Sequence, residues 1–258
     1  MGILNVTPDS FSDGGMFISV EEAVARAGAL VAEGADILDV GGESSRPGSD
    51  PVPAQVEAER VVPVIRMIVK RHPKIPVSID TRKPEVAGQA LAAGAAMIND
   101  ISGMRDGRMI QIAAKSQAPV VVTHMKGEPK TMQKRPVYRD VAGEILRYFR
   151  ERTSVLKKSG IHKIILDPGI GFGKTVSHNF AILNGLEKFA ALGYPLMVGA
   201  SRKSFIGAAL GEPVDRREAA TAAITAVCVM KGASIVRVHN VMDNRHAAIV
   251  AERIRKGK

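Results

Sequence analysis

The segment Ile164-Ile-Leu-Asp-Pro-Gly-Ile-Gly-Phe-Gly-Lys174 decides the fold that we expect for this chain. Three apolar residues that favour strands run into Asp167, and alternate glycines and then a lysine follow. A short apolar run that ends in turn residues is typical of a strand buried on both faces of a parallel sheet. Asp167 then lies at the carboxyl end of that strand, where α/β proteins build their sites. A plain strand and loop would explain this stretch alone equally well, so the rest of the chain has to decide.

Short apolar runs alternate with longer stretches of helical periodicity, as in repeated βα units. Strands are predicted at residues 2–6, 35–40, 76–80, 97–101, 119–124, 164–167, 196–200 and 235–239. Helices are predicted at residues 20–33, 54–71, 84–93, 108–115, 138–159, 177–191, 216–231 and 243–255. Eight strands with eight following helices predict an α/β fold, a single (β/α)8 TIM barrel over residues 1–258. A doubly wound open sheet is the alternative, less favoured because no Gly-x-Gly-x-x-Gly follows the first strand.

The composition is that of an ordinary globular chain of 258 residues, of which 45% are hydrophobic. We find no signal peptide and no apolar run long enough to cross a bilayer, so we expect no membrane partner. The lone Cys228 cannot build a disulfide framework, which favours a reducing cytoplasm. The first expected strand begins almost at Met1, with nothing before it to close the barrel floor, as expected for an internal start or a truncation.

The formal net charge of +10 leaves two classes of partner open, nucleic acid and an anionic small molecule. Much of the positive charge falls on expected helix surfaces and the tail, within residues 147–158 and 253–258. Aromatic residues make up only 4% of the chain and tryptophan is absent, so base stacking has little to work with. We therefore interpret the charge as solvated helix faces and expect no nucleic-acid partner.

Polar side chains stand at the carboxyl end of every expected strand. In chain order they are Asn5, Asp39, Asp80, Asn99, His124, Asp167, Ser201 and the pair Arg237 and His239. Any one of them is more often a helix cap or a turn residue than a ligand-binding group. A barrel gathers all its strand ends on one face, so the whole set predicts a single pocket there.

Two glycine-rich loops follow the first two strands. Residues 7–15 are polar, carry an aromatic side chain and end in two glycines, which is typical of a lid over a barrel mouth. Residues 41–48 combine two serine hydroxyls with Arg46, groups suited to an anion.

The last two strands end in further polar groups. After the seventh strand, Ser201 is expected to cap a short helix that runs to Leu210, and Lys203 to reach back over the pocket. After the eighth, strand alternation points Arg237 and His239 to the same side. Barrels of this type commonly hold phosphate near these two strands.

The candidate residues sort into two chemical halves. One half suits a flat, nitrogen-rich heterocycle and comprises Asp80, Asn99, Asp167 and Lys203. The other half suits a diphosphate with Mg²⁺, which favours few protein oxygens plus phosphate, and comprises Asn5, Ser45, Arg46, Arg237 and His239. No His/Cys cluster has zinc spacing, and no Ser-His-Asp arrangement follows from the order of residues.

With these residues in place, the sequence resembles the dihydropteroate synthase family, folate-pathway enzymes that sulfonamides target. The resemblance runs through nearly the whole chain. It is carried by residues 2–15, 39–48, 80–81, 99–100, 124–125, 167–174, 201–204 and 237–239. Each motif alone is weak, but the set in this order is specific.

The resemblance implies that 6-hydroxymethyl-7,8-dihydropterin diphosphate condenses with 4-aminobenzoate to give 7,8-dihydropteroate and diphosphate. It implies C–O cleavage with Mg²⁺-bound diphosphate leaving, followed by attack of the aniline nitrogen on the pterin methylene. It also implies a homodimer through helices of the later half of the barrel.

The family's motifs carry residue roles onto this sequence. The pterin would be held by Asp80, Asn99, Asp167 and Lys203, and the diphosphate by Asn5 at the Mg²⁺ together with Ser45, Arg237 and His239. The aminobenzoate site would be shaped by Arg46, Pro47, Phe172, Ser201 and Lys203, and catalysis would rest on Asp80, Lys203, Arg237 and His239. Ser45 stands where the family usually has Thr, and its hydroxyl is expected to keep the phosphate contact.

Two other functions remain as alternatives. A pterin-binding methyltransferase that passes a methyl group to a corrinoid protein would keep the pterin acids but has no use for a diphosphate grip. A basic barrel that binds nucleic acid would explain the charge but not the ring of polar strand ends. Failure to bind oligonucleotides whatever the salt concentration would remove the second alternative.

Overall fold

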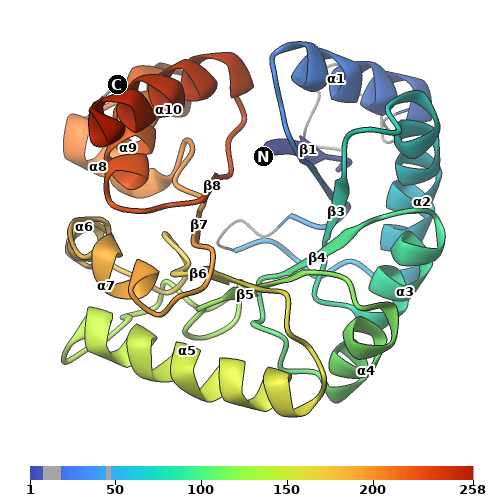
Figure 1. Cartoon of the computed structure of the whole chain (residues 1–258), viewed down its shortest axis with the longest axis horizontal. Helices are drawn as coiled ribbons and strands as arrows, with labels where there is room; N and C mark the ends of the chain where they lie inside the picture. Colours follow the sequence, from blue (N-terminus) through green and yellow to red (C-terminus); the bar gives the residue numbers. More distant parts are fainter. Residues whose placement is uncertain (8–18, 45–47, 258) are drawn as a thin grey trace.

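The computed structural model describes residues 1–7, 19–44 and 48–257. Parallel strands form its centre, and helices follow one another around them (Figure 1). The strands are β1 Gly2–Asn5, β2 Leu38–Gly41, β3 Val77–Asp80, β4 Met97–Asp100, β5 Val120–Thr123, β6 Ile164–Asp167, β7 Met197–Val198 and β8 Ile235–Val236. The helices are α1 Val20–Ala32, α2 Ala54–Arg71, α3 Pro84–Ala92, α4 Gly107–Ser116, α5 Val141–Lys158, α6 Val176–Asn184, α7 Leu186–Ala190, α8 Ser204–Leu210, α9 Glu218–Met230 and α10 Val241–Lys256.

The strands pair in the order in which they occur along the chain. β1 to β6 form one parallel sheet in sequential order, and β7 pairs with β8. Single parallel bridges, Leu166 with Leu196 and Gly2 with Val238, link the two sheets at both edges. A doubly wound sheet reverses its strand order partway, so this order rules out that alternative and agrees with the expected barrel.

Two expectations about the later helices were wrong. The helix predicted over residues 177–191 is divided into α6 and α7 at Gly185, whose φ of −105° and ψ of 21° leave the helical conformation. Ser201 does not cap the short helix α8: that helix begins at Ser204 after Lys203, which gives no side-chain cap, and Ser201 bonds elsewhere.

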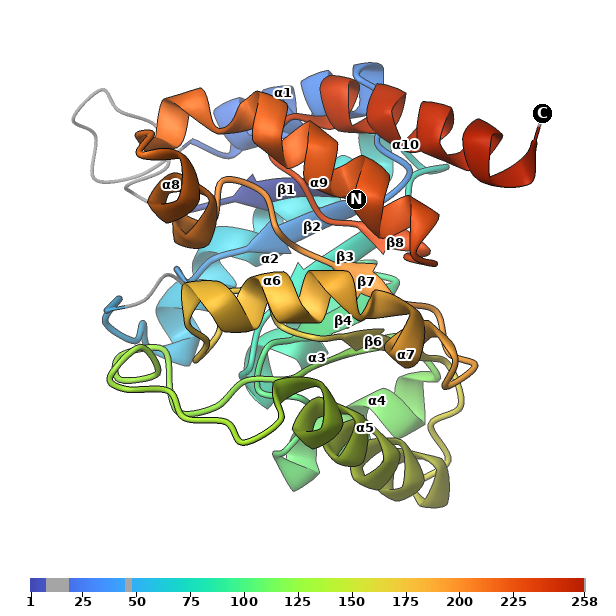
Figure 2. The ribbon, with the colours of Figure 1, turned by 90° about the vertical axis from the view of Figure 1, so that its left-hand side faces the viewer.

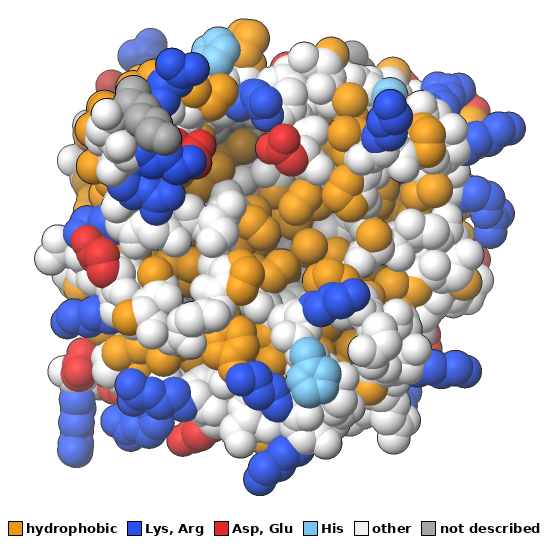
Figure 3. Space-filling model, viewed as in Figure 1, with side chains coloured by type: hydrophobic (Ala, Val, Ile, Leu, Met, Phe, Trp, Pro, Cys, Tyr) orange, Lys and Arg blue, Asp and Glu red, His pale blue; other side chains and the backbone are white. Residues whose placement is uncertain are grey.

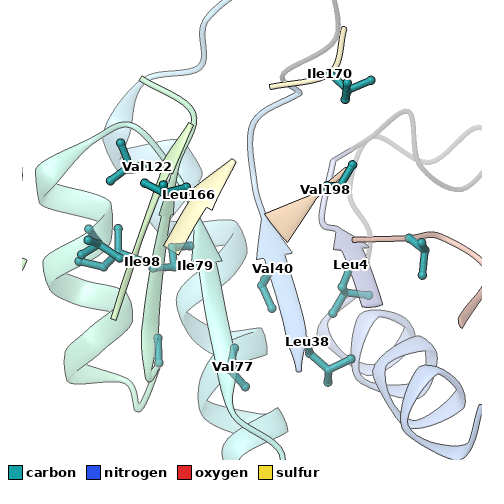
Figure 4. Packing of buried hydrophobic residues seen from close by; sticks show 14 of the residues in the cluster. Leu4, Leu38, Val40, Val77, Ile79, Ile98, Val122, Leu166, Ile170 and Val198 are labelled. Atoms are coloured by element: carbon teal, nitrogen blue, oxygen red, sulfur yellow. The ribbon is translucent and has the colours of Figure 1, made fainter. Parts of the chain in front are cut away.

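Side chains alternate across each strand, so the barrel has an outer and an inner packing layer. The outer layer lies between strands and helices and includes Leu4, Leu38, Ile79, Ile98 and Leu166, drawn in Figure 4. The inner layer closes the barrel floor with Met1, Met97, Val121, Ile165 and Met197, against which Ile37 and Ile235 pack. Above this apolar floor, the next inward positions of β2, β4 and β6 are polar and buried: Asp39, Asn99 and Asp167.

The two ends of the barrel differ. In the side view, the loop after β5 projects at one end and the C-terminus lies at the other (Figure 2). In the view of Figure 1, hydrophobic side chains gather in the middle of the surface, and Lys and Arg are spread around its edge (Figure 3).

Among the described residues, no helix combines the length and the apolar character that crossing a membrane requires.

Candidate active site

The strand ends bring the predicted acids together at one end of the barrel. Asp80 pairs in register with Asn99 on the neighbouring strand, and Thr123 pairs with Asp167. Asp39, Asn99 and Asp167 are buried, and Asp80 keeps 11% of its side chain exposed. Polar side chains buried above an apolar floor cost folding free energy, so their presence marks a site for a polar ligand.

Arg237 joins two acids at the centre of this group. Its Nε–H donates to Asp39 Oδ2 and an Nη2–H donates to Asp80 Oδ2, each over 2.5 Å. Burial raises the pKa of Asp80, and the charge of Arg237 opposes that rise. Burial lowers the pKa of Arg237, but the two acids more than offset this. The sequence placed Arg237 with the diphosphate group alone, whereas the structure places it on the acids as well.

Asn99 offers an unused acceptor to this space. Its Nδ2 donates to Asp39 Oδ2 over 2.9 Å. Its Oδ1 is buried and has no hydrogen-bond partner among the residues that the structure describes. A buried acceptor without a partner is rare in folded proteins and indicates that a ligand or water supplies the donor.

Asp167 is held by its own glycine-rich loop. The Gly169 N–H donates to Asp167 Oδ1 over 2.7 Å, so one carboxylate oxygen is fixed in the loop. Burial raises the pKa of Asp167, and this N–H, Lys203 and Lys174 oppose the rise. A side chain at Gly169 would place its Cβ 2.0 Å from the carbonyl oxygen of His124. The glycine thus lets the loop after β6 touch the end of β5.

We expect Gly169→Ala to lower the free energy of unfolding by about 3 kcal/mol, because left-handed strain and a backbone collision add. Gly193→Ala is the matched control: Gly193 also has a positive φ, of 79°, but within the described part of the chain its Cβ would meet no atom within 4 Å. The control should lose only about 1 kcal/mol, the strain alone. Urea denaturation of both variants measures the difference, and equal losses would contradict the close approach.

Lys174 is a site residue to which sequence reasoning gave no role. It is 3% exposed, and its Nζ donates to the carbonyl oxygens of His124 and Phe172, each over 3.0 Å, and lies 3.1 Å from His124 Nδ1. Burial lowers the pKa of Lys174 to about 7. Burial and the nearby Lys174 lower the pKa of His124 to about 2, so His124 is neutral. This pair holds the loop after Asp167 in place. The only sign of that role in the sequence is a lysine at the end of the glycine-rich segment.

Lys203 lies near the acids Asp80 and Asp167 and against an aromatic ring. Its Nζ is 4.0 Å from the centroid of the Phe172 ring, a cation–π contact. Burial and the neighbouring Arg237 lower its pKa from 10.5 to about 8, against the opposing charges of Asp167 and Asp80. The amine is therefore a cation at neutral pH and loses its proton as the pH rises through about 8.

We expect kcat/KM to fall as the pH rises above about 8, because the Lys203 cation is lost from the site there. In Lys203→Arg this alkaline limb should move above about pH 10, since a guanidinium does not titrate in that range, although the absolute rate will fall. Initial rates from pH 6 to 10 measure the limb. An alkaline limb at the same pH in both proteins would exclude Lys203 as its source.

Ser201 and His239 form a second polar pair at the ends of β7 and β8. Ser201 Oγ lies 2.9 Å from His239 Nδ1, and the His239 N–H donates to Ser201 Oγ over 3.2 Å. The structure therefore brings together two residues that the resemblance assigned to different substrates. Ser45, Arg46 and Pro47 lie outside the described residues, as do residues 8–18 of the expected lid.

The fit of this site to Mg²⁺ rests on Asn5. In the described ranges no group of three His, Cys, Asp or Glu side chains has the geometry of a metal site. Asn5 Oδ1 and Asp80 Oδ2 lie 3.8 and 3.7 Å from the position of a Cβ built on Gly41, so they face one small space. This oxygen set fits an ion that takes most of its ligands from phosphate and water.

The fold and the site together define an α/β barrel in which buried acids and the cations Lys203 and Arg237 gather at one end. A family model described as "Pterin binding enzyme" matches residues 1–239. The dihydropteroate synthase of Escherichia coli strain K12 is 45% identical over 254 residues, which cover 98% of this chain and 90% of that protein.

Solved structures agree with this match. The Yersinia pestis dihydropteroate synthase with a sulfonamide drug has a TM-score of 0.94 at 40% identity, covering 100% of this chain and 93% of that one. The Xanthomonas albilineans enzyme with 7,8-dihydropteroate has a TM-score of 0.89 at 41% identity, covering 98% and 92%. The chain belongs to the pterin-binding enzymes, and within that family to the dihydropteroate synthases. The barrel and the family resemblance expected from the sequence are confirmed.

Proposed function

We propose that this protein condenses 6-hydroxymethyl-7,8-dihydropterin diphosphate with 4-aminobenzoate and releases 7,8-dihydropteroate and diphosphate. The observation that carries the proposal is the convergence of buried acids, Lys203 and Arg237 at one end of the barrel. The named activity of the Escherichia coli relative and the 7,8-dihydropteroate bound to the Xanthomonas albilineans enzyme support it. We further propose that residues 1–258 act as one pterin-binding domain.

The pterin ring would lie over the apolar floor among the ring-binding residues. Asp167 has one oxygen fixed by its loop, which leaves the other for an amino and ring N–H edge. Asn99 Oδ1 would accept from a further ring N–H, in keeping with its lack of a partner among described residues. Lys203 would donate to a ring acceptor and, with Phe172 and Ser201, form one wall of the aminobenzoate site beside Arg46 and Pro47.

The diphosphate would lie beyond the ring, toward Asn5, Ser45, Arg237 and His239. In the part of the chain that the structure describes, the ion pairs of Arg237 occupy its Nε–H and one Nη2–H. A guanidinium carries five N–H donors in a fixed fork, so Arg237 can brace the acids and still donate to a phosphate oxygen. Asn5 would hold Mg²⁺, which neutralises charge on the diphosphate when it is bound.

The arrangement matches the charges that the reaction creates. When the C–O bond at the pterin methylene breaks, negative charge grows on the diphosphate and positive charge on the methylene. Arg237 and His239 would stabilise the first and Asp80 the second, from positions that the barrel fixes beforehand. The aniline nitrogen of aminobenzoate then attacks the cation and loses its proton without a strong general base, which is consistent with a neutral His124.

We propose a homodimer that forms through α9 and α10. Large apolar side chains are exposed on these two packed helices: Val227, Met230, Met242, Ile249, Val250 and Ile254. Apolar surface of this kind favours a protein partner. Sedimentation should show a dimer for the unaltered chain and a monomer for Val250→Glu, because a buried carboxylate opposes association. A monomeric unaltered chain at micromolar concentration would contradict the proposal.

We propose that the enzyme works in the cytoplasm, which the state of its cysteine supports. Cys228 is buried, and burial raises the pKa of its thiol to about 12. Such a thiol reacts poorly and takes no part in disulfide exchange.

The test of the proposed reaction combines purified protein, Mg²⁺, pterin diphosphate and 4-aminobenzoate. Release of diphosphate should require both organic substrates, and dihydropteroate should appear in equal amount. Omitting aminobenzoate separates condensation from simple hydrolysis. Methyl transfer from methyltetrahydrofolate to a corrinoid protein without diphosphate release would overturn the proposal in favour of the methyltransferase alternative.

A further inference from the structure

We infer that Asp39 is a positioning residue that fixes the side-chain amide of Asn99 with its oxygen toward the pterin ring. The inference rests on the ring site proposed above and adds to it a residue that does not itself touch substrate. Asp39 lies within β2 and Asn99 within β4, with β3 between them. Both side chains are buried, Asp39 completely and Asn99 to within 2%.

The direction of the Asn99 amide follows from hydrogen-bonding chemistry. Asn99 contacts Asp39 Oδ2 over 2.9 Å, and the same oxygen accepts the Nε–H of Arg237 over 2.5 Å. A carboxylate paired with a guanidinium can only accept, whereas an amide has a donor end and an acceptor end. The end of Asn99 that faces Asp39 is therefore the NH₂ group, and Oδ1 is turned away from it.

This orientation decides what Asn99 can recognise. Its Oδ1 is buried and without a partner in the described part of the chain, so it is an acceptor left for a donor that a ligand would bring. With the amide reversed, the same position would present a donor and reject a ring N–H. A site built to pair one polar group discriminates strongly against a ligand that leaves it unpaired.

Folding alone does not account for Asp39. Its Oδ1 is also buried without a partner among the described residues, so the carboxylate is only half satisfied. A half-satisfied buried carboxylate opposes folding. By contrast Ile37, two residues earlier and on the same inner face, packs against the apolar floor. The direction that Asp39 gives to the Asn99 amide explains why an acid stands at this position, since Asp80 also holds Arg237.

Two substitutions separate the acceptor oxygen from the charge. Asp39→Ala removes the acceptor, and we expect the affinity for 6-hydroxymethyl-7,8-dihydropterin, the ring without phosphates, to fall about tenfold by calorimetry. Asp39→Asn keeps one acceptor oxygen and should restore most of that affinity. Binding of inorganic diphosphate with Mg²⁺ should not weaken in either variant, because an acid has been removed from the anion's surroundings.

Controls distinguish positioning from general damage. Thr225→Val removes the buried 2.6 Å hydrogen bond from Thr225 on α9 to Asn244 on α10. It should lower stability and leave the affinities for the ring and for diphosphate unchanged. Equal loss of ring and diphosphate affinity in Asp39→Ala, or no loss of ring affinity, would overturn the inference. Asn99→Ala tests the ring site itself: ring affinity unchanged there would overturn the proposed site, and the inference with it. Loss in Asn99→Ala but not in Asp39→Ala would overturn only the role of Asp39.

A measurement on the unaltered protein covers the case in which Asp39→Ala does not fold. With ¹⁵N-labelled asparagine, the Asn99 side-chain NH₂ resonance, assigned from its absence in Asn99→Ala, should show slowed hydrogen exchange. Titration with the pterin ring should leave this protection in place, because the ligand uses the oxygen end of the amide. Rapid exchange of this NH₂ in the ring-free protein would show that Asp39 does not hold it, and the inference would fail.

Discussion

Asp167→Asn is expected to lower the affinity for the pterin ring about a thousandfold while the fold persists, because a charge-assisted pair of hydrogen bonds is lost. In the structure the Gly169 N–H occupies Asp167 Oδ1. An amide at this position must either turn its NH₂ toward Gly169, and lose that bond, or turn it toward the donors of the ring. Calorimetric titration with the ring, beside circular dichroism for the fold, measures the effect.

Asp100→Asn is the matched control for the loss of a buried carboxylate at a strand end. Asp100 ends β4 but accepts hydrogen bonds from Ser102 and from the Met104 N–H within its own turn. Its substitution should lower stability and leave ring affinity unchanged, since its oxygens are used by the fold. Unchanged ring affinity in Asp167→Asn would refute the assignment of Asp167 to the pterin.

The positions of the site residues could be predicted because strand periodicity is regular. A side chain at a strand end either faces the barrel interior or faces a helix, and two-residue alternation decides which. Asp80 beside Asn99 follows from that rule and from the order of the strands. The same rule predicts an apolar floor, which Met97, Val121 and Ile165 form, but sequence reasoning did not use it there.

Contacts across the barrel could not be predicted in this way. Arg237 reaches from the end of β8 past β1 to acids on β2 and β3, and no spacing in the sequence encodes that reach. Lys174 donates mainly to backbone carbonyls, which every residue has, so its partners cannot be predicted from residue types. By contrast, the break between α6 and α7 falls at an Asn-Gly dipeptide, a turn signal that could have been read as the end of a helix.

Arg237→Ala is expected to have the largest effect on stability, about 3–5 kcal/mol, because it leaves Asp39 and Asp80 buried without their cation. It should also abolish productive binding of the diphosphate substrate. Affinity for a pterin without phosphates should fall as well, because Arg237 also holds Asp39 and Asp80 beside the proposed ring site. Thermal unfolding and calorimetry with both ligands measure the two effects.

The pH dependence of this variant separates loss of an ion pair from loss of packing. Burial raises the pKa of Asp80, and Arg237 is the charge that opposes this rise, so removing Arg237 raises that pKa further. The folded variant then binds more protons than its unfolded chain at neutral pH, and its stability falls as the pH rises. The loss of unfolding free energy relative to the unaltered protein should therefore shrink from pH 8 toward pH 5, which unfolding measured at each pH would detect.

Arg245→Ala is the control, because it removes an exposed arginine that lies 3.3 Å from Asp36. It should lower the free energy of unfolding by less than about 1 kcal/mol at every pH. A deficit in Arg237→Ala that stays constant with pH would mean that the arginine acts through packing, and its charge would then have no part in preparing the site for a leaving diphosphate.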